Sequence, residues 1–179
     1  MNLKISTALI FFLVLTGTIM TLLQPSSSKQ KTPGIPLVAI QEIEHELNLI
    51  AKALGHVTED GLKIPMIRLE SYKKTKSIDD ALSQYKKAYF ELSNLMNHQS
   101  ISINNTLFNE SIPRICLSLV FADSSSKGVK SPYVSYIGMG PKGLLVVSSI
   151  DHETDRYRDI YETSLRELFK EELSLDEVE

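Results

Sequence analysis

One long uncharged apolar segment near the start of the chain constrains where everything after it can fold. Residues 5–23 carry no charged side chain and are mostly Leu, Ile, Phe and other apolar residues. As a helix rising ~1.5 Å per residue, the segment would be about 28 Å long, close to the ~30 Å hydrocarbon thickness of a bilayer. We therefore expect residues 5–23 to form a transmembrane signal-anchor helix, preceded by a short tail of residues 1–4.

A cleaved secretory signal is the main alternative for this segment. Its apolar run is longer than the 7–15 residues typical of a signal-peptide core, and no pair of small residues follows it at Leu22–Pro25. Lipid attachment to a cysteine at the end of this segment is excluded, because the only cysteine of the chain is Cys116. Length and the missing cleavage site favour an uncleaved anchor, whereas cleavage would release a secreted protein.

The charges beside the apolar segment give only a slight indication of orientation. Lys4 precedes the segment, and Lys29 and Lys31 follow it, so the count is almost balanced. A short leading tail is commonly left in the cytoplasm. We therefore expect a single-pass membrane protein whose large domain lies on the non-cytoplasmic side.

The remainder of the chain divides into a linker and one domain. Residues 24–36 contain three prolines and three consecutive serines, which predict a solvated linker. Residues 37–179 are enough for one domain with its own core, and a single cysteine allows no intrachain disulfide. Residues 151–179 hold 11 acidic and 4 basic side chains. We expect an acidic C-terminal tail and no nucleic-acid partner.

Hydrophobic periodicity predicts a mixture of helices and strands in the domain. Apolar residues three and four apart predict amphipathic helices at residues 37–54, 77–96 and 153–173. Apolar, β-branched runs predict strands at residues 62–69, 114–122, 133–137 and 144–150. The expected fold is α+β: the transmembrane helix, then a compact domain of about three helices and a small, mainly antiparallel sheet.

The motifs that could carry chemistry all lack their structural context. Residues 138–143 match G-x-G-x-x-G, but an apolar strand follows where a dinucleotide site needs a helix, so a hairpin is the better interpretation. Candidate metal ligands are Glu42, His45 and Glu46 in one group, and Asp151, His152 and Asp155 in another. The first group has the Glu-x-x-His spacing, which needs a second copy on another helix, and the sequence has none. The second group falls at an expected helix start, where acidic residues are common because of the helix dipole. We therefore assign no catalytic residue, no metal site and no cofactor.

Two sequons are the only candidate modification sites. Asn104 and Asn109 each begin an N-x-S/T triplet without proline, the acceptor pattern for N-glycosylation. They would be used only in a eukaryotic secretory lumen.

These features favour a membrane-anchored, non-catalytic interaction or assembly factor with an unidentified protein partner. The alternative is a membrane-tethered enzyme with a pocket near the 123–130 loop and the 138–143 hairpin. An apolar surface patch would favour the first function. A deep pocket with convergent polar groups would favour the second. The groups considered for that pocket are Asp123, Ser124, Lys127, Lys142 and His152.

The anchor can be tested directly. If residues 5–23 span a bilayer, the full-length protein should stay in the membrane fraction through carbonate extraction and keep its encoded N-terminus. Immunoblotting and N-terminal sequencing check this. A soluble protein that begins near Pro25 would instead establish signal cleavage.

Overall fold

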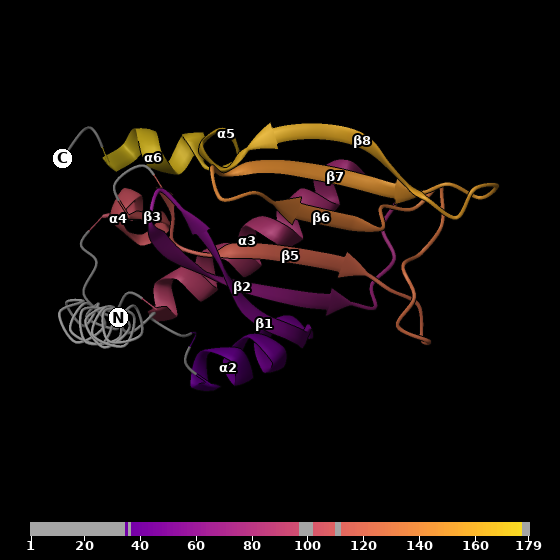
Figure 1. Cartoon of the computed structure of the whole chain (residues 1–179), viewed down its shortest axis with the longest axis horizontal. Coiled ribbons are helices and arrows are strands. Elements are labelled where there is room, and N and C mark those ends of the chain that lie inside the picture. Colours follow the sequence, from indigo (N-terminus) through magenta and orange to yellow (C-terminus); the bar gives the residue numbers. More distant parts are fainter. Residues whose placement is uncertain (1–34, 36, 97–101, 110–111, 177–179) are drawn as a thin grey trace, which may run out of the picture. The chain divides into compact units, whose positions relative to one another are not determined.

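A six-stranded mixed sheet, ordered β1-β2-β5-β6-β7-β8, forms the centre of the fold (Figure 1). The computed structural model describes residues 35, 37–96, 102–109 and 112–176. The strands of this sheet are β1 (Ile50–Glu59), β2 (Leu62–Ser71), β5 (Cys116–Phe121), β6 (Tyr136–Met139), β7 (Leu144–Ile150) and β8 (Tyr157–Ser164). A separate ribbon pairs β3 (Phe108–Asn109) with β4 (Ile112–Pro113). The helices of the described residues are α2 (Leu37–Leu47), α3 (Ile78–Met96), α4 (Ile103–Leu107), α5 (Leu165–Leu168) and α6 (Lys170–Asp176).

The β1–β2 hairpin is built by local turn chemistry. Asp60 and Gly61 have φ values of 48° and 79°, and two consecutive positive φ values are typical of a type I′ hairpin turn. Pro65 lies opposite His56 of β1, one residue before β2 begins to pair with β5 at Met66. At that point β2 has a neighbour on one side only, so the N–H that proline lacks is not needed.

The second and third strands of the sheet, β2 and β5, are parallel, whereas every other neighbouring pair is antiparallel. A parallel pair needs a long crossover connection. Helix α3 belongs to that connection and crosses one face of the sheet (Figure 1). The Tyr85 hydroxyl of α3 donates a hydrogen bond to the Leu117 carbonyl of β5 at 3.0 Å, which fixes the helix to the central strand.

The hydrophobic core lies between α3 and the sheet. Ser77 accepts a hydrogen bond from the Asp80 N–H at 3.2 Å at the start of the helix, a normal N-terminal cap. From there one face of α3 is buried against strand residues such as Leu69 and Leu117. The buried hydrophobic residues of α3 are Ala81, Leu82, Tyr85, Ala88, Tyr89 and Leu92.

The opposite face of the sheet is more polar. Ser118 and Tyr136 share a hydrogen bond at 3.1 Å there. The Tyr136 ring lies over Gly138, where a Cβ would collide with the ring unless the ring moved, so this position favours glycine. Cys116 lies on the same face but is only 2% exposed. Burial raises the pKa of the Cys116 thiol to about 11.

The predicted fold is wrong in several respects, although the α+β combination is present. The sheet has six strands and a parallel pair, not about four mainly antiparallel strands, and five helices replace the expected three in the part of the chain that the structure describes. No helix of that part is both long and apolar enough to span a membrane. The predicted transmembrane helix, residues 5–23, lies outside the described residues, as does all of the 24–36 linker except Ile35.

The helix predicted for residues 37–54 ends early, at Leu47. Asn48 has a positive φ of 52°, a left-handed conformation that commonly ends helices and that asparagine adopts more readily than most residues. The chain then turns back as β1, so Ile50 and Leu54 pair with β2 instead of continuing the helix. The Glu44 carboxylate accepts from the Ala51 N–H at 2.8 Å across this reversal.

The helix predicted for residues 153–173 is mostly wrong. Residues 157–164 form strand β8, which pairs antiparallel with β7 along its length and contains a bulge at Ile160. Tyrosine and isoleucine favour strands, and pairing with the edge of β7 stabilises the strand over the helix at residues 157–164. Only beyond Ser164, which accepts from the Glu167 N–H at 3.1 Å, does the chain become helical.

Leu92→Ala should destabilise the protein by about 2–5 kcal/mol, because Leu92 is fully buried and its truncation leaves a cavity under the sheet. Leu144→Ala is the matched control, since Leu144 is half exposed and its loss should cost no more than about 0.5 kcal/mol. Urea unfolding followed by circular dichroism measures both. A larger loss from Leu144→Ala would mean that the core has been placed wrongly.

Cys116 should be almost unreactive towards maleimide at pH 7.5 in the folded protein. The thiolate is the reacting form, and a pKa of about 11 leaves very little of it at that pH. Labelling followed by mass spectrometry should accelerate sharply in denaturing urea, which exposes the thiol and restores its ordinary pKa. Rapid labelling of the native protein at neutral pH would contradict the burial.

Candidate functional site

The enzyme-type pocket expected between the 123–130 loop and the 138–143 hairpin does not form. The loop follows β5 and the hairpin follows β6, and these two strands are antiparallel neighbours. The two connections therefore lie at opposite ends of the sheet (Figure 1). The Lys142 ammonium group lies 3.5 Å from the Glu59 carboxylate at the end of β1. Asp123 lies at the other end of the sheet.

Asp123 itself stabilises the loop that contains it. Its Oδ1 accepts hydrogen bonds from the Ser125 N–H at 2.8 Å, the Ser125 hydroxyl at 2.6 Å and the Lys127 N–H at 3.1 Å. These bonds, led by that of the Ser125 hydroxyl, lower the pKa of Asp123. An aspartate used in this way is a turn residue.

The candidate metal ligands stay apart from one another. Glu42, His45 and Glu46 are exposed on α2, and no group of three suitable ligands occurs among the described residues. His152 hydrogen-bonds through Nε2 to the Ser131 carbonyl.

The two sequons lie near one another in α4 and β3. Asn104 is half-buried within α4, and its Thr106 is buried, with a hydroxyl that donates to the Ser102 carbonyl at 3.0 Å. Asn109 is the last residue of β3, and the rest of its sequon lies outside the described residues. Glycosylation at either asparagine stays a prediction.

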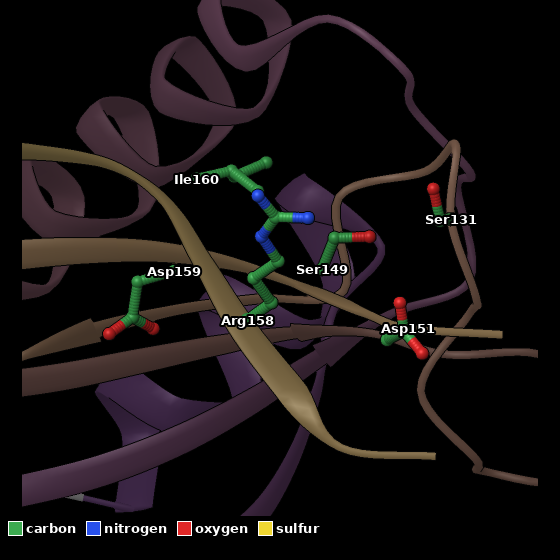
Figure 2. Close-up of a pocket in the computed structure, with 6 residues that line it drawn as sticks. All are labelled: Ser131, Ser149, Asp151, Arg158, Asp159 and Ile160. Carbon is green, nitrogen blue, oxygen red and sulfur yellow. The ribbon is translucent and has the colours of Figure 1, made fainter. Parts of the chain in front are cut away.

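A pocket of about 310 Å³ lies where the β5–β6 loop meets the ends of β7 and β8. Figure 2 shows the side chains that line it. They are Ser131, Ser149, Asp151, Arg158, Asp159 and Ile160. Sequence reasoning singled out only Asp151 among them.

Three contacts tie the walls of this pocket together. The Ser131 N–H donates to the Ile150 carbonyl at 2.9 Å, and the Ser149 hydroxyl donates to the Tyr133 carbonyl at 2.9 Å. Lys130 forms an ion pair with Asp155 of the β7–β8 connection at 2.5 Å. The β5–β6 loop is therefore fastened to both neighbouring segments, and the pocket is preformed.

Asp151 is held in place by its own turn. Its Oδ1 accepts from the Glu153 N–H at 2.9 Å, the Thr154 N–H at 2.8 Å and the Thr154 hydroxyl at 3.0 Å. The hydrogen bonds from Thr154 and then Glu153 lower its pKa, and the nearby charge of Arg158 lowers it further. Asp151 therefore stays ionised at neutral pH. Its Oδ2 accepts no hydrogen bond from the residues that the structure describes.

Arg158 supplies the positive charge of the pocket. It lies opposite Ser149 in the β7–β8 register, and its guanidinium group is on the same side of β8 as Ser149 (Figure 2). Asp159 points away from it and accepts from the Ser148 hydroxyl at 2.8 Å. Within the described part of the chain, Arg158 forms no ion pair, with Asp151 or any other acid.

A second feature of the same region is the exposed apolar surface of β8. Tyr157, Ile160 and Tyr161 are 54%, 42% and 43% exposed. Tyr157 packs edge-on against Tyr136, with ring centroids 5.8 Å apart. We call the exposed side chains of Tyr157, Ile160 and Tyr161 the β8 strip. Tyr157 lies opposite Ile150 and Tyr161 lies opposite Val147, three residues apart on β7, so the strip wraps around the edge of the sheet from one face to the other.

Comparison with known proteins identifies no relative. No protein-family model, no curated protein and no solved structure matches this chain. The chemistry of the pocket and of the β8 strip is therefore the basis for assigning a function.

Proposed function

We propose that residues 37–179 form a non-catalytic protein-interaction domain, which the apolar segment 5–23 holds beside a membrane. The β8 strip is the surface through which it binds a partner. The observation that carries this proposal is the concentration of exposed tyrosine and aliphatic side chains on one edge strand. Tyrosine is enriched at protein interfaces because it buries a large apolar area and keeps a hydrogen-bonding hydroxyl.

The edge of β8 is suited to side-chain contacts and poorly suited to accepting another strand. The bulge at Ile160 interrupts the regular ladder, and Arg158, Asp159 and Glu162 place charges along the strand. Bulges and charges are the usual features that prevent edge-to-edge pairing. The partner is therefore expected to bury the side chains of the β8 strip without extending the sheet.

The rival function, a tethered enzyme, has lost its expected site. The loop and the hairpin that were to enclose it lie at opposite ends of the sheet. Asp123 is engaged in its own turn, and Lys142 is paired with Glu59. These placements favour the interaction function over that enzyme.

Photo-crosslinking in intact cells tests the β8 strip. Benzoylphenylalanine at Tyr157 or Tyr161 of the full-length protein should crosslink to one and the same partner protein. The control position is Lys63, which is exposed on β2 beside the β1–β2 turn, four strands away from β8 in the sheet. Equal crosslinking from residue 63 would remove the β8 strip as the binding surface, and adducts only to a second copy of the chain would indicate a homodimer instead.

A double substitution then measures how much the tyrosines contribute. Tyr157→Ser with Tyr161→Ser should weaken recovery of the crosslinked partner at least about tenfold, because aromatic interface residues commonly cost more than 1 kcal/mol each when truncated. Lys63→Ser should leave recovery unchanged. Thermal unfolding of all variants checks that the fold is intact.

A further inference from the structure

The pocket beside β8 contains one fixed negative charge and one positive charge that do not neutralise each other directly. Asp151 is held by three hydrogen bonds to its Oδ1, which leaves its other oxygen available. The Arg158 guanidinium lines the same pocket and forms no ion pair within the described residues. Two opposite charges kept apart across a small cavity favour a ligand that places a complementary charge at each.

The size and rigidity of the pocket fit a small molecule. Its volume of about 310 Å³ is at the lower end of ligand pockets. Its walls are fastened by the Ser131–Ile150 and Ser149–Tyr133 hydrogen bonds, so little ordering is needed when a ligand enters. The Ile160 side chain supplies an apolar contact beside the charged groups.

The charge balance decides between classes of ligand. A guanidinium group binds carboxylates through two parallel hydrogen bonds. A bare carboxylate or phosphate would also meet the ionised Asp151 and be repelled. Lys74 and Lys76 lie over the Tyr133 ring and do not line the cavity, so they add no direct contact for a second negative charge.

We propose that this pocket binds a zwitterionic ligand of the free α-amino-acid class. Its carboxylate contacts the Arg158 guanidinium, and its ammonium group contacts Asp151. The Ser149 hydroxyl donates to Tyr133 and keeps its lone pairs for the ligand, so it can accept a further hydrogen bond from the ammonium group. The charged contacts of this site, Arg158 and Asp151, are not part of the β8 strip, which shares only Ile160 with the pocket.

Ligand-observed NMR on the full-length protein in detergent micelles tests the proposal with three matched probes. L-alanine carries both charged groups, propionate lacks the ammonium group, and ethylammonium lacks the carboxylate. L-alanine should give saturable binding, and each of the other probes should bind at least about tenfold more weakly, since a hydrogen-bonded charged group is lost in each case. Inorganic phosphate should also bind more weakly than L-alanine.

Charge-removing variants assign the binding to this pocket. Arg158→Gln and Asp151→Asn should each weaken L-alanine binding at least about tenfold. Asparagine keeps the Oδ1 acceptor, so the turn at Glu153 and Thr154 is preserved. Arg156→Gln and Glu153→Gln are the matched controls on the same connection and should bind L-alanine normally. Circular dichroism confirms folding of each variant.

Four results would overturn the assignment. Propionate binding as tightly as L-alanine would mean a simple carboxylate site, and phosphate binding more tightly would mean an anion site. Absence of saturable L-alanine binding by the folded protein, or equal binding by Arg158→Gln, would show that the pocket does not hold an amino acid. None of these results bears on crosslinking from the β8 strip, so the two proposals fail separately.

Discussion

The parallel pairing of β2 with β5 is the constraint on which the rest of the structure depends. Parallel neighbours cannot be joined by a tight turn, so the chain between them must cross the sheet. Helix α3 lies in that crossing and buries its apolar face on the sheet, which places Tyr85 and Leu92 in the core. The antiparallel strands β6, β7 and β8 then follow on one side of β5, and the β1–β2 hairpin closes the other side.

This arrangement leaves the sheet with two edges, and both edges are irregular. β1 has a register shift between Ala51 and Ala53, and β8 has one at Ile160. Such shifts, with charges nearby, discourage uncontrolled strand pairing. The exposed tyrosines of β8 therefore lie on an edge that resists sheet extension, which makes a specific side-chain interface the physically consistent use of that surface.

The pocket arises from the same topology. The β5–β6 loop and the β7–β8 connection lie at one end of the sheet, because β5 and β7 run in the same direction. The loop is fastened to the end of β7 by the Ser131–Ile150 hydrogen bond and to the β7–β8 connection by the Lys130–Asp155 ion pair. The pocket and the β8 strip thus share strand β8. A ligand at Arg158 and a partner at Tyr161 would contact different residues of that strand.

The sequence alone determined the features that depend on neighbouring residues: the long amphipathic helix with its Ser77 cap, the Asp60–Gly61 turn and the buried strand around Cys116. The tertiary structure decided the secondary structure where the spacing of apolar residues was ambiguous. Apolar positions three and four apart in residues 153–173 suit a helix, but pairing with the edge of β7 makes residues 157–164 a strand. It also decided the pocket. Arg158 meets Ser149 only through the β7–β8 register, and Ser131 joins them from a different loop. Local propensity acts within a few residues, whereas register and crossover are set by contacts between distant segments, and no short sequence window contains that information.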